Sequence, residues 1–201
     1  MKPITHMLRA LFVVLAAFAL ASACAEDSSN NKSDGDEHLH ALEVNTVSGG
    51  HADIMDTMWE VCIDNGDSTS TEYSFMFEEH DSQSSHADFA SSDCSGTATE
   101  THTELFELEV LGDKSVSWAD GTAPGSLSSD VTASKCGMTY EDGSVEKILI
   151  YVDDTSSHAV MYLGLNEDSS ATSYPSVLDN TGWSLDTEVH ADDEEADHHD
   201  E

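Results

Sequence analysis

Positively charged residues are scarce in this chain, which has 6 lysines and arginines against 41 aspartates and glutamates, for a formal charge of −35 at pH 7. Loss of residues 1–23 would remove Lys2 and Arg9 but no acidic residue, leaving no arginine and a charge of −37. Nucleic acids and anionic headgroups are bound through Lys and Arg, so the composition argues against both partners. It favours a cationic partner or, more simply, adaptation to salt, which screens self-repulsion.

The common sequence motifs of catalysis are also missing. The chain contains no G-x-S-x-G, no G-x-x-x-x-G-K-[ST] and no H-E-x-x-H. The acidic stretch 64–72 lacks the spacing of a calcium-binding EF-hand loop and is better explained as a hairpin turn. We therefore expect a protein that is not an enzyme.

Only one apolar run precedes the acidic part of the chain, and it lies near the start. "LFVVLAAFALASA", at 11–23, follows Lys2 and Arg9 and ends in small residues before Cys24. This layout is typical of a secretory signal peptide, and the run is shorter than the about 20 residues that span a bilayer. We expect residues 1–23 to be a signal peptide that is cleaved before Cys24.

The residues around this cleavage point suggest a lipid anchor. "LASAC", at 20–24, resembles the bacterial lipobox, although that motif prefers Leu one place nearer to the cysteine. The resemblance implies a lipoprotein acylated at Cys24, and the absence of Asp at Ala25 implies, by resemblance to a bacterial sorting rule, the outer membrane. The alternative is ordinary cleavage after Ala23, which would give a secreted or periplasmic soluble protein.

Composition divides the remaining chain into three parts. Residues 24–51 are polar and acidic and are predicted to form a disordered tether, since they hold too few apolar residues to order themselves. Residues 52–187 have the length of a single domain. Residues 188–201, "EVHADDEEADHHDE", are predicted to form a second disordered tail that is rich in His, Asp and Glu.

Within 52–187 the apolar residues repeat with a period of two. Tyr73, Phe75 and Phe77 alternate with polar residues, and the stretch 104–111 alternates in the same way. The stretches "EKILIYVDD" and "HAVMYLGL" contain continuous apolar runs, which indicate strands covered on both sides, and "DDTSS" between 145–152 and 158–165 predicts a hairpin. We expect an all-β domain, a small antiparallel β-barrel or sandwich, in which a closed barrel would also protect the strand edges.

The four cysteines are consistent with an exported protein, in which disulfides persist. If Cys24 carries lipid, three cysteines remain, and we favour a Cys62–Cys94 disulfide with Cys136 left as a free thiol. If Cys24 is not lipidated, four cysteines allow three pairings. A third alternative is that all the cysteines stay reduced.

Histidines near acidic residues at the two ends of the chain form a weak candidate site for Zn²⁺ or Cu²⁺, because imidazole and carboxylate groups bind these ions. The simpler interpretation is that they are solvated residues of low-complexity ends. The other histidines are expected on the surface. The candidate metal ligands are His38, His40, His190, His198 and His199.

Four short motifs in the domain are similar to motifs of a group of known proteins. W-x-x-C at 59–62, F-x-x-x-x-C at 89–94, Y-L-G at 162–164 and Y-P-S-V-L-D at 174–179 resemble a loose group of small bacterial exported proteins, some lipocalin-like. The chain departs from this group at Cys136 and in its acidity. The resemblance implies no activity, because the group has none assigned.

Together these features predict a lipid-anchored cell-envelope protein that acts as a non-enzymatic binding or interaction module. Its partner would be a small apolar ligand or another envelope protein, since small barrels either hold one ligand or are filled by their own side chains. The alternative function is metal binding or buffering through the His/acid-rich ends.

Overall fold

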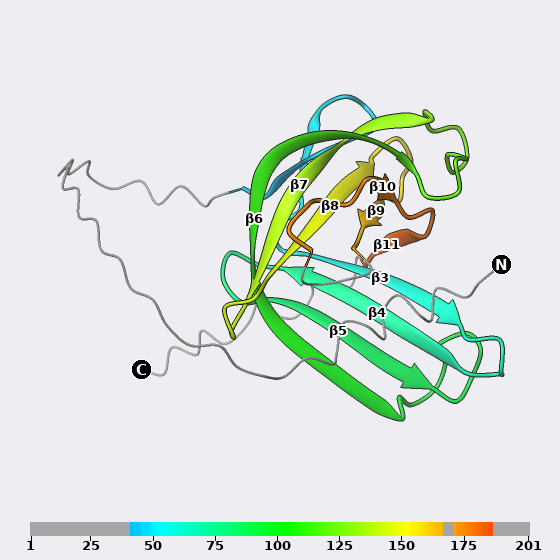
Figure 1. Ribbon diagram of the computed structural model, residues 1–201. Coiled ribbons are helices and arrows are strands. Elements are labelled where there is room, and N and C mark those ends of the chain that lie inside the picture. Colours follow the sequence, from blue (N-terminus) through cyan, green and yellow to red (C-terminus); the bar gives the residue numbers. More distant parts are fainter. Residues whose placement is uncertain (1–40, 167–170, 187–201) are drawn as a thin grey trace, which may run out of the picture.

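A computed structural model describes residues 41–166 and 171–186, and the description below is confined to them. These residues form strands, turns and loops, with no helix among them. Figure 1 labels most of the strands along the chain. The strands are β1 (Glu43–Asn45), β2 (His51–Asp53), β3 (Thr57–Asp64), β4 (Ser70–Phe77), β5 (Ser82–Phe89), β6 (Glu100–Trp118), β7 (Asp130–Tyr140), β8 (Val145–Asp153), β9 (Val160–Gly164), β10 (Val177–Leu178) and β11 (Gly182–Asp186).

Eight of these strands close into an antiparallel β-barrel. Around the barrel the order is β6, β5, β4, β3, β11, β9, β8 and β7, and β7 pairs again with β6. The predicted all-β fold is therefore confirmed, and the barrel is the form that it takes. The predicted hairpin between 145–152 and 158–165 is also present, because Tyr151 of β8 lies opposite Tyr162 of β9.

The long strand β6 closes the barrel and belongs to both of its halves. Its first part, Glu100–Phe106, pairs with β5, and from Phe106 onward it pairs with β7. The register shifts between Val110 and Asp113, where Gly112 has a φ of 102° that favours glycine. In Figure 1 β6 bends sharply along its length and joins the sheet of β3, β4 and β5 to the sheet of β7, β8 and β9.

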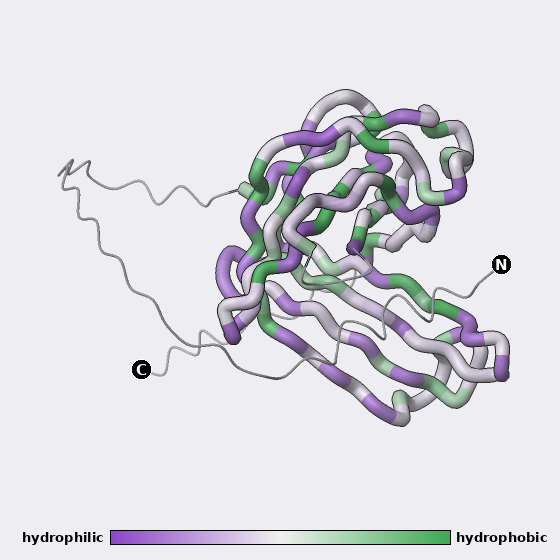
Figure 2. The backbone as a smooth tube through the Cα atoms, viewed as in Figure 1, coloured by the Kyte–Doolittle hydropathy of each residue, from purple (hydrophilic) through white to green (hydrophobic). Residues whose placement is uncertain are grey.

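Apolar side chains fill most of the barrel interior, and Figure 2 shows the hydrophobic residues recurring along the strands. β8 illustrates the pattern, since Ile148 and Ile150 belong to this core while Leu149 and Tyr151 belong to a second cluster on the opposite face. The prediction that this strand is covered on both sides is confirmed. The buried side chains of this core are Val44, Ile54, Trp59, Phe77, Phe106, Cys136, Met138, Ile148, Ile150, Val152, Met161, Leu163 and Trp183.

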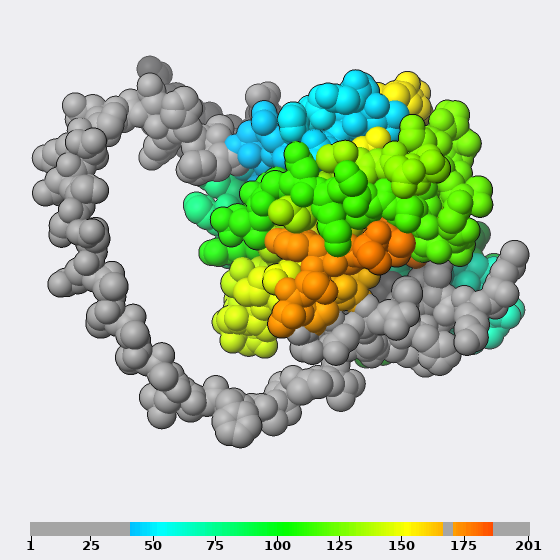
Figure 3. All heavy atoms as spheres, turned by 45° about the horizontal axis from the view of Figure 1, so that its top comes forward, coloured from blue at the N-terminus to red at the C-terminus, as the bar shows by residue number. Residues whose placement is uncertain are grey.

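The ordered domain begins earlier than residue 52, the boundary expected from composition. β1 and β2 form a hairpin, and Val44 of β1 is completely buried against the barrel core. Thr46 pairs in parallel with Val152, and the Val47 amide donates to the Val152 carbonyl at 3.0 Å. Figure 3 shows this hairpin, in blue and cyan, lying against the body of the protein. The last part of the predicted tether is therefore a piece of the fold.

The three lysines of the described residues gather around the segment before β10. Lys114 donates to the carbonyl oxygens of Tyr174 and Pro175, and Lys147 donates to that of Thr172. Lys135 and Lys147 each lie 5.6 Å from the centre of the Tyr174 ring, within the range of cation–π contacts. The segment, orange in Figure 3, lies against β6. The described positive charges of this acidic protein thus hold one segment to the barrel wall.

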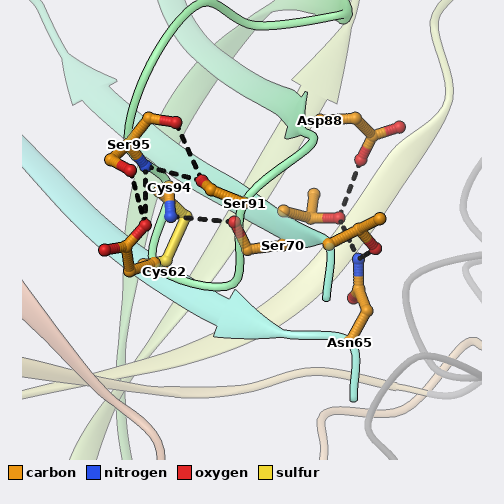
Figure 4. Close-up of a disulfide and its surroundings, with 10 residues drawn as sticks. Cys62, Asn65, Ser70, Asp88, Ser91, Cys94 and Ser95 are labelled. Carbon is orange, nitrogen blue, oxygen red and sulfur yellow. Dashed lines mark hydrogen bonds between the residues drawn. A yellow bond between two sulfur atoms is a disulfide. The ribbon is translucent and has the colours of Figure 1, made fainter. Parts of the chain in front are cut away.

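Cys62 and Cys94 form a disulfide, as predicted. The bond links β3 to the loop after β5, with 6.0 Å between the two Cα atoms. The Cys94 amide donates to Ser70 Oγ at 2.8 Å, and Figure 4 shows this contact beside the loop's own bonds between Ser91 and Ser95. Cys136 is a free thiol inside the barrel, where burial raises its pKa to about 12 and suppresses its reactivity.

Candidate ligand-binding site at one end of the barrel

Side chains do not fill the barrel completely, and a small pocket remains at one end. Its volume is about 40 Å³, room for about three water molecules at 10–15 Å³ each. Residues of six barrel strands and the loop after β9 line it. They are Tyr73, Ser74, Phe75, Ser84, Ser85, His86, His102, Glu104, Met138, Tyr140, Glu146, Leu165 and Trp183.

The period of two along each strand places polar groups in this pocket. Glu146 shares its face of β8 with Ile148 and Ile150, whose side chains belong to the barrel core. Glu104 shares its face of β6 with Phe106 in the same way. Both glutamates therefore point inward, while Lys147 and Glu107 of these strands belong to the outer face.

Glu146 is the most unusual group in the site, because it is an acid that is only 3% exposed. The Tyr140 hydroxyl donates to its Oε2 at 3.1 Å, but its Oε1 is buried without a hydrogen-bond partner among the described residues. Burial is the main cause that raises the pKa of Glu146. The Tyr140 hydrogen bond acts in the opposite direction, and the charge of Glu104 raises this pKa further. A buried acceptor left unpaired costs about 1–3 kcal/mol, so Glu146 does not stabilise the free protein as a simple core residue would.

Tyr140 is held as a hydrogen-bond donor. Burial raises the pKa of its hydroxyl well above the ordinary value, and the neighbouring Glu146 raises this pKa further. The phenol therefore keeps its proton throughout the neutral range. Its ring also lies 6.2 Å from that of Phe106, which packs it against the barrel core.

Aromatic rings form much of the remaining wall. The ring centroids of Phe75 and Trp183 lie 5.1 Å apart, and Phe75 meets Phe106 edge-on at 6.1 Å. The site therefore combines an acidic group with aromatic surfaces, an arrangement typical of small-molecule sites, in which apolar walls surround a few placed polar groups.

Two histidines lie at the mouth of the pocket. The rings of His86 and His102 stack with 4.8 Å between their centres, and Tyr73 lies 6.0 Å from His86. His102 Nε2 also lies 2.7 Å from Glu100 Oε1. The expectation that both histidines are simple surface residues is therefore incomplete. His102 keeps half of its side chain exposed, but both residues line the pocket.

The lipidation and metal predictions concern residues that the structure does not describe. Cys24 lies outside residues 41–166 and 171–186, as do the metal candidates His38, His40, His190, His198 and His199. These hypotheses therefore stay predictions.

Sequence reasoning missed the acidic pocket itself, although a signal for it exists. Glu146 stands two residues before Ile148, and Glu104 two residues before Phe106, so the same alternation that predicts the core residues also predicts both acids to point inward. An acid that falls on the apolar face of a strand marks a candidate site, because burying it needs a compensating partner.

Searches for other functional features and for related proteins give negative results. Among the described residues, no group of three or more His, Cys, Asp or Glu side chains is arranged to hold a metal ion. No helix in that part of the chain has the length and apolar character to cross a membrane. Comparisons of the chain with protein-family models, curated proteins and solved structures find no match.

Proposed function

We propose that this protein is a non-enzymatic binding module of the cell envelope, in which the β-barrel holds a small molecule at the end where Glu146 lies. The observation that carries the proposal is the unpaired, buried Oε1 atom of Glu146 in an aromatic-walled pocket. A ligand that supplied a donor to this atom would satisfy it, and the binding free energy would offset the cost of keeping the acid buried.

The size of the pocket limits this proposal. The barrel interior is filled mostly by its own core, so a large apolar ligand enclosed within the barrel does not fit the geometry. The pocket accepts instead the end of a small molecule, with the remainder lying towards His86 and His102. We therefore restrict the proposed binding of a small molecule to the end of the barrel where Glu146 lies.

A thermal-shift screen tests the binding proposal. The full chain carrying Cys24→Ser is heated with n-butylammonium, n-butanol and n-butyrate, and with the corresponding benzyl compounds, at millimolar concentrations. We expect at least one compound to raise the unfolding midpoint, and we expect Ser84→Phe, which places a ring in the pocket, to abolish that shift. The absence of a shift with every compound would contradict the binding proposal.

The proposal includes a lipid anchor at Cys24 and an outer-membrane location, both supported by the sequence of residues 1–25. Several acyl chains would anchor the protein stably, since each buried methylene contributes about 0.8 kcal/mol. Labelling of cells with a fatty-acid analogue tests the anchor. We expect Cys24→Ser to lose the label and leave the membrane fraction, while Cys136→Ala keeps both. An unlabelled, soluble wild-type protein would instead support ordinary cleavage after Ala23. Separation of the inner and outer membranes on a density gradient tests the proposed location.

Metal buffering by the His/acid-rich ends remains a second hypothesis from the sequence. Calorimetric titration with Zn²⁺ and Cu²⁺, with and without residues 188–201, tests it. The hypothesis predicts that deletion reduces the binding, and negligible binding in both forms would contradict it.

A further inference from the structure

Negative charge in the pocket is not balanced by lysine. Glu104 of β6 and Glu146 of β8 both line it, and Glu104 contributes to raising the pKa of Glu146. The three lysines of the described residues instead contact residues 172–175. Among the described residues that line the pocket, the only basic side chains are the imidazoles of His86 and His102, and His102 contacts Glu100 at 2.7 Å.

The unpaired atom in this pocket is an acceptor. Glu146 Oε1 has no hydrogen-bond partner, while Oε2 already accepts from the Tyr140 hydroxyl. A ligand that fits must therefore bring an N–H or O–H group to Oε1. A carboxylate ligand would bring neither, and it would also meet the negative charges of both glutamates.

The aromatic walls of the pocket further restrict which hydrogen-bond donors a ligand can bring. Tyr73, Phe75, Tyr140 and Trp183 contribute aromatic rings to the lining. The faces of such rings attract organic cations, most strongly when the cation is desolvated. A bare metal ion would use neither the rings nor the apolar surface, and the described residues offer no metal-binding group of three.

We propose that the ligand is a small organic cation, a protonated primary or secondary amine with an apolar substituent, whose N–H donates to Glu146 Oε1. This inference rests on the proposed binding function and names the chemical class of its ligand. The ammonium group and the carbons next to it occupy the pocket, which has a volume of about 40 Å³. The rest of the ligand lies along the aromatic wall towards His86 and His102. The large negative charge of the chain also attracts cations to the protein before they bind.

A matched ligand series tests the inference. Calorimetry of the full chain carrying Cys24→Ser, titrated with n-butylammonium, n-butanol and n-butyrate, compares ligands of the same length that differ in charge. We expect n-butylammonium to bind at least about tenfold more tightly than n-butanol, with no measurable binding of n-butyrate, because a buried charge pair contributes more than a neutral hydrogen bond. The benzyl series repeats the comparison with a larger apolar substituent.

Three variants test whether the selectivity depends on the acids of the pocket. Glu146→Gln keeps the size of the side chain and removes its charge, and we expect the affinity for n-butylammonium to fall by about tenfold or more. Glu107→Gln, which removes an exposed charge from the outer face of β6, is the control and should leave the affinity unchanged. Near-ultraviolet circular dichroism verifies that both variants are folded. Glu104→Gln, on β6, provides a second test with an expected loss of about threefold.

The possible outcomes separate this inference from the function on which it rests. Equal binding of n-butanol and n-butylammonium, or an unchanged affinity in folded Glu146→Gln, would overturn the amine assignment and leave a binding site for neutral molecules. No binding or thermal shift with any compound of either series would overturn the binding function as well.

Discussion

A variant that removes the hydrogen-bonded pair Tyr140 and Glu146 from the pocket is expected to stabilise the protein. The double substitution Tyr140→Phe/Glu146→Met replaces two hydrogen-bonded groups by apolar groups of similar shape. It removes the unpaired Oε1 atom, which costs about 1–3 kcal/mol, and buries a Met side chain, which contributes about 1.5–3 kcal/mol. It also loses one hydrogen bond to a charged group, about 1.5–3 kcal/mol.

The net expectation is a gain of about 1–3 kcal/mol in the free energy of unfolding. At the middle of this range, the thermal midpoint of a domain of this size rises by about 4–8 °C. Urea unfolding followed by tryptophan fluorescence, without ligand, measures the free energy directly. Glu107→Met, at an exposed position, is the control for the loss of one negative charge and should change stability by less than about 0.5 kcal/mol. A double variant less stable than the wild type by more than about 1 kcal/mol would show that Glu146 serves the fold, and would refute the reasoning.

Three further predictions concern the fold. Replacing both Cys62 and Cys94 by Ala should cost about 3–4 kcal/mol in urea unfolding, because the disulfide closes a loop with a separation of 32 residues, and an unchanged stability would contradict this estimate. Val44→Ala should cost about 2–3 kcal/mol, since it removes two fully buried methyl groups and leaves a cavity, whereas a truly disordered tether predicts no loss. The thermal midpoint should rise in 1 M NaCl, where the Debye length falls to about 3 Å, and should also rise as the pH falls from 8 towards the ordinary glutamate value of 4.5. Burial and the charges of Glu72 and Asp186 raise the pKa of Glu60, so the folded state holds this proton more tightly than the unfolded chain, and its contribution to stability falls as the pH rises. Equal midpoints across salt or pH would show that the repulsion between carboxylates is unimportant.

Local patterns in the sequence predicted part of the barrel, namely β4, the middle of β6, β8 and β9, but they did not predict β5, β7 or β11. The continuous apolar runs Ile148–Val152 of β8 and Met161–Leu163 of β9 are buried on both faces, as such runs predict. The turns at Asn65-Gly66 and Asp142-Gly143 lie between paired strands, and both glycines adopt the positive φ that these turns require.

The parts that the sequence did not predict depend on contacts between distant residues. β1 has only three residues in a polar stretch, and Val44 is buried because Thr46 pairs with Val152, more than a hundred positions away. A three-residue strand has no periodicity of its own, so composition assigned it to the tether. Along β6, Phe106 belongs to the core inside the barrel, whereas Val116 and Trp118, an even number of positions further on, belong to the second cluster on the opposite face. This change of face follows from the irregularity at Gly112, which alternation alone does not predict.

The pocket shows the same division between local and distant information. The inward direction of Glu104 and Glu146 follows from their spacing to Phe106 and Ile148, so each could be assigned to the interior from the sequence. Their position near one another requires the closure of β6 onto β7 and of β7 onto β8, which no local pattern specifies. The hydrogen bond between Tyr140 and Glu146 is easier to predict from the sequence, because the two residues flank a single tight turn.

The most direct test of the proposed binding site is a carbon-detected NMR titration of the Glu146 carboxyl group, assigned by comparison with Glu146→Gln. In the free protein, the account predicts a pKa above the ordinary glutamate value, because the carboxyl group is buried. With saturating n-butylammonium, it predicts that this pKa falls, since a cation at Oε1 favours the charged carboxylate. A Glu146 pKa that is the same with and without the amine would contradict the account.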